Sequence, residues 1–219
     1  MKIAAKIKYK TRLALGQQPV IQFGIPRSGS TLVYNLLREL LPSPYFILKT
    51  HALRPKDLQQ KIVATYRNPL DVMASVFESH GLAVTDEEIR KQLFLLSKHG
   101  LWDVFELKHK PNALLLRYEE FVGNFALLFD EIGHFFEIDI PQAQRQALSD
   151  RYDIQRVKQS IDPAKDFSHK DKRGFHGKHV SRFEGGSGYF SDVFEPGQIE
   201  YMQRYFSFFM QEMGYPSAD

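Results

Sequence analysis

The sequence predicts an α/β protein with three layers, α/β/α, around a central and mostly parallel sheet. Two observations lead to this fold. Short apolar runs without polar alternation recur between longer segments of helical periodicity, and the first run enters a turn containing proline and glycine that opens directly into a helical pattern. At 219 residues the chain is long enough for one sizeable core and short for two. We therefore expect a single domain over residues 1–219.

The elements follow from these patterns in chain order. The predicted strands are residues 20–25, 45–48, 62–66 and 113–116. The predicted helices are residues 31–41, 69–79, 86–98, 125–136 and 197–213. Thr85 is a suitable N-cap for the third helix, because acidic residues follow it in the first turn. In such a sheet, ligands bind where the strands reach their carboxyl ends.

Composition excludes several classes of function. The net charge of +3 and the pI near 8.9 are mildly basic, and the cations are spread along the chain. This distribution favours a small polyanionic ligand over a nucleic acid, which needs many phosphate contacts at once. The absence of cysteine excludes disulfides, thiolate metal sites and cysteine nucleophiles.

The start of the chain carries no predicted signal peptide. Residues 1–12 are basic, but only the short apolar run Leu13-Ala14-Leu15 follows. No stretch approaches the roughly eighteen apolar residues of a membrane span. We expect a cytoplasmic protein without stable membrane insertion, although a basic N-terminus that touches a membrane stays an alternative.

The first functional motif is a phosphate-binding loop. Gly24-Ile25-Pro26-Arg27-Ser28-Gly29-Ser30-Thr31 has the spacing G-x-x-x-x-G-x-(S/T), follows a strand and opens a helix, so its N–H groups can cradle an anion. The predicted fold is thus P-loop-containing. Ser30 occupies the place of the lysine that nucleoside triphosphatases use, and Arg27 is the only cation of the loop. This difference argues against an ordinary ATPase or kinase.

A bound metal is not expected at this loop. No apolar strand ends in an acid that would hold magnesium, because residues 62–66 lead to Arg67 and residues 113–116 lead to Arg117. We therefore predict transfer of an anionic group without a metal. The alternative is that Ser28 and Gly29 merely shape a strand-to-helix turn.

The loop resembles the 5′-phosphosulfate loop of sulfotransferases that use 3′-phosphoadenosine 5′-phosphosulfate (PAPS), with the pattern P-(K/R)-(S/T)-G-(S/T)-(S/T). The resemblance implies a cytosolic-type or bacterial member that moves a sulfuryl group from PAPS to a hydroxyl or amine. The product nucleotide would be 3′-phosphoadenosine 5′-phosphate (PAP). It implies that the phosphosulfate is held by Arg27, Ser28, Gly29, Ser30 and Thr31.

A second segment joins the third predicted strand to a helix. Asn68 is a suitable N-cap, Pro69 takes the first helical position and Asp71 can complete the cap. Arg67 ends the strand, and Ser75 lies one to two turns into the helix. An anion beside this helix could meet both Arg67 and Ser75.

This segment resembles the 3′-phosphate element of the same family, R-(N/D)-P-x-D-x-x-x-S, at every fixed position. The resemblance implies that Arg67 and Ser75 bind the 3′-phosphate. A guanidinium suits this task because it makes charge-assisted bonds in a planar fork. The alternative is a surface ion pair of Arg67 with Asp71 or Glu78.

A third segment, Lys172-Arg173-Gly174-Phe175-His176-Gly177, reads by itself as a solvated basic turn. It resembles the family's R-K-G-x-x-G loop, although the usual continuation D-W-K-N is replaced by residues 178–181. The resemblance implies that Lys172, Arg173 and Gly174 contact the 3′-phosphate. Gly185-Gly186-Ser187-Gly188 further on suggests a mobile lid.

The candidate catalytic residues follow the second predicted strand. Lys49-Thr50-His51 resembles the K-T-H element of the cytosolic enzymes, which implies that His51 is the general base and that Lys49 and Arg27 stabilise the leaving phosphate. Tyr118 resembles the tyrosine of a Y-E-(D/E) element beside the adenine. For Tyr118 the alternative is core packing.

The acceptor is expected to be a small molecule. The residues that flank the motifs and could line its pocket are Phe77, His80, Phe94, Trp102 and Phe183. His176 and His179, with His169 upstream, are a weak ligand set without a matched acid, so we predict no metal site.

Two other functions stay open from the sequence. One is a nucleotide kinase with an atypical P-loop, which would bind ATP with magnesium. The other is a non-catalytic module that binds PAP without turnover, against which the intact His51 argues.

Overall fold

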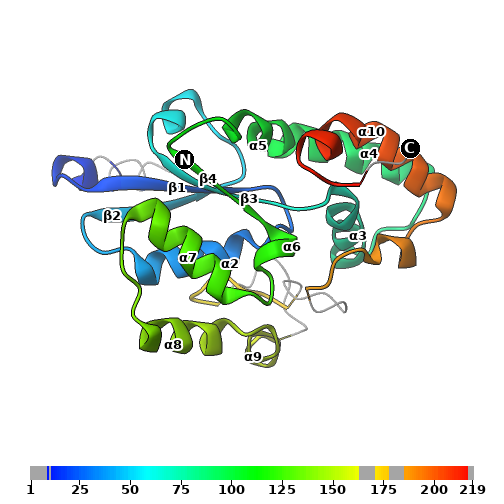
Figure 1. Cartoon of the computed structure of the whole chain (residues 1–219). Coiled ribbons are helices and arrows are strands. Elements are labelled where there is room, and N and C mark those ends of the chain that lie inside the picture. The colour runs from blue at the N-terminus through cyan, green and yellow to red at the C-terminus, as the bar shows by residue number, and fades with distance from the viewer. Residues whose placement is uncertain (1–8, 10, 163–170, 178–184, 217–219) are drawn as a thin grey trace.

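The computed structural model describes residues 9, 11–162, 171–177 and 185–216. Within them lies a sheet of four strands, β1 (Gln18–Gly24), β2 (Tyr45–Thr50), β3 (Lys61–Tyr66) and β4 (Ala113–Arg117). Every pairing is parallel, in the order β2-β1-β3-β4. The carboxyl ends of the four strands therefore lie at the same edge of the sheet (Figure 1).

Helices cover both faces of this sheet (Figure 1). One face carries α2 (Ser30–Leu40), α6 (Tyr118–Phe121), α7 (Phe125–Phe136), α8 (Gln142–Tyr152) and α9 (Ile154–Ser160). The other face carries α3 (Pro69–His80), α4 (Asp86–Leu96), α5 (Trp102–Leu107) and α10 (Pro196–Glu212). The short turns are η1 (Pro55–Gln59), η2 (Ser97–Leu101) and η3 (Tyr189–Asp192). The predicted three-layer α/β/α fold with a parallel sheet is confirmed.

The two central strands supply both hydrophobic cores. Ile21 of β1 and Ile62 of β3 pack with α3, α4, α5 and α10, whereas Val20 and Val63 pack with the helices of the opposite face. Side chains of a strand alternate between the faces of the sheet. Because both faces are covered, successive residues of these strands are buried and most of them are apolar, which explains the runs without polar alternation. The polar exceptions Gln22 and Thr65 are fully buried as well.

All nine expected elements are present, with bounds within two residues of the expected ones. The sequence patterns missed α5, α6, α8 and α9. In α8 only Leu148 and Tyr152 are buried, so the helix shows no apolar stripe. The expected helix over residues 86–98 ends at Leu96, where the chain continues through the π-helical turn η2 into α5. Among the described helices, none is both long and apolar enough to cross a membrane.

Candidate active site

The loop between β1 and α2 requires glycine at two positions. A Cβ atom on Gly24 would lie 2.3 Å from Thr65 Oγ1 and 2.7 Å from Ser30 Cβ. Gly29 has a φ of +75°, and a Cβ there would lie 2.9 Å from Cζ of Phe121. The two glycines therefore allow the tight turn that places the first N–H groups of α2, which have no partner within the helix, above the end of β1.

Ser28 lies beneath this loop and is fully buried. Its Oγ lies 2.7 Å from the carbonyl oxygen of Ile25 and 2.8 Å from Thr65 Oγ1. These hydrogen bonds tie the loop to β3. The hydroxyl of Ser28 thus has a structural role, because its hydrogen bonds hold the loop against β3.

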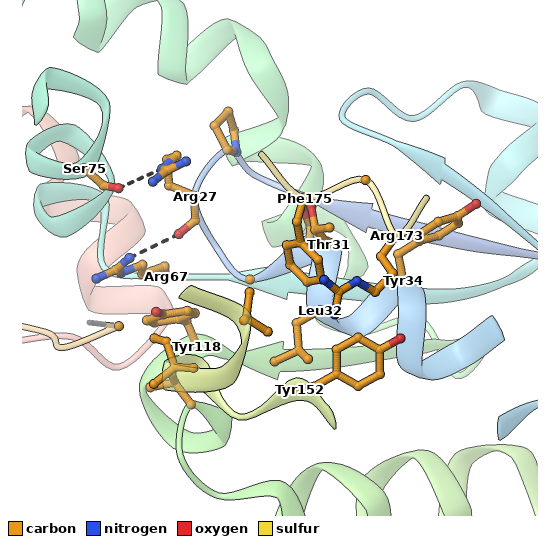
Figure 2. Close-up of a pocket in the computed structure, with 18 of the residues that line it drawn as sticks. Arg27, Thr31, Leu32, Tyr34, Arg67, Ser75, Tyr118, Tyr152, Arg173 and Phe175 are labelled. Carbon is orange, nitrogen blue, oxygen red and sulfur yellow. Dashed lines mark hydrogen bonds between the residues drawn. The ribbon is translucent and has the colours of Figure 1, made fainter. Parts of the chain in front are cut away.

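Arg27 reaches across the loop to helix α3. Its φ of +62° is unusual for a residue other than glycine, and such backbone strain often occurs at functional sites. Arg27 Nε donates a hydrogen bond to Ser75 Oγ at 2.8 Å (Figure 2). Burial lowers the pKa of Arg27 from its ordinary value. The structure thus brings together Arg27 and Ser75, which the family resemblance assigns to the 5′-phosphosulfate and the 3′-phosphate respectively.

Arg67 projects from the end of β3 and is 3% exposed. Its Nη1 donates to the carbonyl oxygen of Arg27 at 3.2 Å, and Nη2 donates to that of Gly186 at 2.7 Å. The Tyr118 ring stacks on the guanidinium, with 4.1 Å from Cζ to the ring centroid; burial raises the pKa of this tyrosine. Nε is buried and has no hydrogen-bond partner among the described residues. The alternative of a surface ion pair for Arg67 is not what the fold forms.

The cap of α3 differs from the expected one in one residue. The side chain of Asn68 accepts from the Leu70 N–H at 2.9 Å, as a predicted N-cap does. Asp71, however, does not complete this cap. Its Oδ2 accepts from the Gly188 N–H at 2.8 Å, and the N–H of Asn68 donates instead to Glu119 Oε1 at 2.8 Å. Tertiary contacts from two distant segments have replaced a local contact.

His51 and Lys49 lie at the carboxyl end of β2. His51 is exposed, and its Nδ1 lies 2.7 Å from the carbonyl oxygen of Gly24. A carbonyl oxygen can only accept, so Nδ1 carries the proton and Nε2 is the basic nitrogen of the neutral ring. Lys49 Nζ donates to Thr31 Oγ1 at 2.6 Å, at the start of α2. A base and a cation therefore flank the phosphate loop.

These residues surround one cavity of about 690 Å³. The predicted site residues that line it are Arg27, Gly29, Ser30, Thr31, Lys49, His51, Arg67, Ser75, Tyr118, Arg173 and Gly174. Two predicted residues are not in its lining: Ser28 is buried under the loop, and Lys172 is exposed outside it. Segments from residue 26 to residue 186 thus meet at the edge that the parallel sheet predicts.

An apolar wall of the cavity was missed by the sequence analysis. Its residues are Leu32, Val122, Phe125, Ile154, Val157 and Phe175. They come from α2, the α6–α7 region, α9 and the loop at 171–177, and Figure 2 shows Leu32, Tyr118 and Phe175 around the same space. Apolar side chains carry no chemical signature in a sequence, and α9 itself was not expected. Such a wall suits the flat face of a base or ring.

The segment at residues 171–177 lies against α2 and α9. Arg173 Nε donates to Asp171 Oδ2 at 2.9 Å and Nη2 to Ser160 Oγ at 2.8 Å, while the carbonyl of Arg173 accepts from Asn35 Nδ2 at 2.8 Å. Gly174 approaches Thr31. Arg173 and Gly174 therefore lie beside α2, where Asp171 folds the segment into a turn.

A different segment, Gly185–Gly188, contacts Arg67. Besides the bonds of Gly186 and Gly188 given above, a Cβ on Gly185 would lie 2.8 Å from Ile154 Cδ1 and 3.1 Å from the Tyr118 hydroxyl. The expected lid segment is thus bonded to Arg67, one of the two residues that the resemblance assigns to the 3′-phosphate, and to Asp71. The three glycines of this segment were its only signal in the sequence. The tertiary structure shows that they contact Arg67, Asp71 and Tyr118.

The candidate acceptor residues separate into three groups. His80 lines the cavity, Phe77 is buried in the core, and Phe94 and Trp102 are exposed on α4 and α5. Phe183 lies outside the described residues. Of the four candidates that the structure describes, His80 is the one that lines the cavity.

The weak metal-ligand set can be followed only in part. His176 is buried at the cavity, whereas His169 and His179 lie outside the described residues. Within the described part of the chain, no group of three or more metal-ligating side chains occurs.

Comparison with known proteins adds a family and a fold. The sulfotransferase domain family matches residues 38–214, which include His51, Arg67 and Ser75 and begin after the phosphate loop. No curated protein sequence matches the chain significantly.

Several solved structures share the fold. The mouse sulfotransferase SULT7A1, crystallised with PAP, has a TM-score of 0.67 and 20% sequence identity, over 89% of this chain and 85% of that one. Retinol dehydratase, in complex with androsterone and the inactive cofactor PAP, has a TM-score of 0.57 and 16% identity, over 88% and 80%. The same enzyme with retinol and PAP has a TM-score of 0.58 and 16% identity, over 88% and 81%. At such identities the likeness shows the fold alone.

Proposed function

This chain belongs to the sulfotransferase domain family, and from that membership we propose that it transfers a sulfuryl group from PAPS to a hydroxyl or amine of a small-molecule acceptor. The second product is PAP. We also propose that residues 1–219 act as one domain, because the proposed site draws on segments from both halves of the chain.

The observation that carries this proposal is the state of Arg67. A guanidinium that is 3% exposed holds a buried Nε without a hydrogen-bond partner among the described residues. No carboxylate of the described residues lies within ion-pair distance of it. A buried cation is costly unless a charge or hydrogen bonds compensate it. An anionic group that enters the cavity beside Arg67 would supply both.

The charge of the cavity suits a nucleotide with several phosphates. Arg27, Lys49, Arg67 and Arg173 line it, and Asp153 is the single carboxylate among the described lining residues. Asp153 already accepts from the N–H groups of Gln155 and Arg156 at the start of α9. A site with this excess of cations attracts polyanions such as PAPS.

The residues divide into two anion subsites under this proposal. Arg27 and the N–H groups of Ser28 to Thr31 would hold the 5′-phosphosulfate, as a helix N-terminus suits an anion. Arg67 and Ser75 would hold the 3′-phosphate, with the Gly185–Gly188 segment beside them. Tyr118 and the apolar wall would contact the adenine. PAPS supplies the activated sulfuryl group.

The residues proposed to catalyse the transfer lie at the end of β2. His51 Nε2 would take the proton of the acceptor hydroxyl or amine, since Nδ1 is committed to the Gly24 carbonyl. Lys49, hydrogen-bonded to Thr31, would stabilise the negative charge that remains on the phosphate side. Arg27 would assist it from the loop.

Calorimetric titration with PAP in EDTA, beside ATP with magnesium, tests this function. We expect micromolar or tighter PAP binding, weak ATP binding, and a loss of about 100-fold in PAP affinity in Arg67→Ala, because two or more charge-assisted bonds disappear. Arg204→Ala is the control, since Arg204 is exposed on α10 and lies outside the cavity lining.

Other outcomes would point to the other two functions. Tight magnesium-ATP binding without PAP binding would overturn the proposal in favour of an atypical kinase. PAP binding without turnover of PAPS on a broad panel of phenols, alcohols and amines would identify a non-catalytic module.

A further inference from the structure

Two consecutive residues after β4 hold the two ends of Arg67. The ring of Tyr118 stacks on its guanidinium. The next residue, Glu119, accepts a hydrogen bond through Oε1 from the Asn68 N–H at 2.8 Å. That N–H belongs to the peptide group that joins Arg67 to Asn68. Glu119 is therefore hydrogen-bonded to the backbone of the arginine, on the opposite end from its guanidinium.

A peptide group is planar, so its N–H cannot be fixed without fixing the rest of the group. The bond to Glu119 therefore sets the orientation of the plane that contains the Arg67 carbonyl and Cα. This orientation decides the direction in which the Arg67 side chain leaves β3. A hydrogen bond to a carboxylate is about twice as strong as one between neutral groups, which suits a positioning task.

The second oxygen of Glu119 reaches another part of the chain. Oε2 accepts from the Tyr215 hydroxyl at 3.0 Å and lies 3.6 Å from Arg117 Nε. Tyr215 is 5% exposed, and the Arg117 guanidinium lies over its ring with Cζ 4.1 Å from the centroid. Glu119 thereby connects the end of β4, the β3–α3 turn and the segment after α10. It is not part of the cavity lining.

We propose that Glu119 is a positioning residue for recognition of the 3′-phosphate, acting through the Arg67–Asn68 peptide and braced by Tyr215. This inference rests on the proposed function, because it takes Arg67 as the 3′-phosphate ligand. Arg67 needs such support because its side chain bonds only to the backbone carbonyls of Arg27 and Gly186 among the described residues. A small tilt at its Cα displaces the guanidinium, and a shift of about 1 Å can cost a site about 100-fold.

The test compares two nucleotides that differ only in the 3′-phosphate, PAP and adenosine 5′-phosphate. We expect Glu119→Ala to lower PAP affinity about tenfold or more and to leave adenosine 5′-phosphate affinity within about twofold. Glu119→Gln is expected to retain PAP affinity, because its amide oxygen can accept from the Asn68 N–H and its amide nitrogen can donate to the Tyr215 oxygen. Tyr215→Phe should cause a smaller loss in the same direction.

Glu120→Ala is the matched control, because Glu120 is the neighbouring acid, contacts the same Arg117 and is 59% exposed. Equal losses for both nucleotides in Glu119→Ala, or no loss for PAP, would overturn the proposal. If Glu119→Ala does not fold, the ratio of PAP affinity to adenosine 5′-phosphate affinity in Glu119→Gln and Tyr215→Phe decides the question. The positioning role is contradicted if this ratio stays at the wild-type value in Tyr215→Phe and falls to about one in Glu119→Gln. A wild-type protein that binds both nucleotides equally would instead refute Arg67 as the 3′-phosphate ligand, and the proposed function with it.

Discussion

The two ends of the cavity differ in burial and in how their residues are held. At the phosphate end, Arg67 and Ser75 are 3% and 2% exposed and are bonded to other segments of the protein. At the end proposed for transfer, His51 is exposed. The phosphate end is thus built into the fold, whereas the transfer end stands open at its surface.

Under the proposed function, this contrast separates nucleotide binding from the transfer step. Substitutions at the buried end disturb packing and hydrogen bonds, so we expect them to change stability and nucleotide affinity together. Substitutions at the open end remove a reactive group and few contacts. They should change the rate of transfer with little effect on folding.

His51→Ala is the sharpest test of that separation and has the largest expected effect. Loss of a general base should lower the transfer rate by about 100-fold to 10,000-fold, measured with radiolabelled PAPS and any acceptor that the wild type sulfates. PAP affinity and the free energy of unfolding should stay near the wild-type values. His109→Ala, at an exposed position outside the cavity lining, is the control. Full activity in His51→Ala would remove this residue from the mechanism.

Gly29→Ala probes the buried end, and Gly81→Ala is its matched control. Both glycines have positive φ, +75° and +62°, but a Cβ at Gly29 would strike Phe121 while one at Gly81 meets nothing within 4 Å. We expect Gly29→Ala to lower the free energy of unfolding by about 2–4 kcal/mol and Gly81→Ala by about 1 kcal/mol. Chemical denaturation measures both. Equal decreases in the free energy of unfolding would show that the loop accommodates the added methyl group. The phosphate end would then be less rigid than its contacts indicate.

Asp71→Asn has the smallest expected effect, on the pH dependence of stability. Burial raises the pKa of Asp71. Between the ordinary pKa and the raised one, the native state therefore binds a proton that the unfolded chain has lost. The contribution of this carboxyl is full below its ordinary pKa and is lost as pH rises through the native one. Asparagine does not titrate, and its amide oxygen can still accept from the Gly188 N–H.

The stability of Asp71→Asn relative to the wild type should therefore increase as pH rises from about 4, by less than about 1.4 kcal/mol per pH unit, the limit for one proton. Urea denaturation across this range measures it, with Asp192→Asn at an exposed position as the control for loss of one carboxylate. A relative stability that falls over the same range would contradict the sign.

Much of the fold could be predicted from the sequence, because the patterns that indicate its strands and helices involve neighbouring residues. Strands covered on both faces are apolar at most of their positions, as in β1 and β3. Caps such as Asn68 and Thr85 act within three residues. The helices that were missed lack such signals. α8 buries only two side chains, and α6 and α9 are short.

The candidate site was readable in part for the same reason. The phosphate loop and the ends of β2 and β3 converge because parallel strands place their carboxyl ends at one edge, and each motif follows a strand directly. The position of Arg173, the contacts of Gly185–Gly188 and the apolar wall depend on how separate segments pack. No local pattern records them.

The sequence by itself determined the layered α/β fold, the loop between Gly24 and Thr31, and the order of the motifs along the chain. Only the tertiary structure decided that Arg27 meets Ser75, that Glu119 takes the place of Asp71 at the Asn68 N–H, and that Gly186 contacts Arg67. The physical reason is the range of the interactions. Periodicity and capping act over a few neighbouring residues, whereas these contacts join segments 48 to 119 residues apart and form only when the layers pack together.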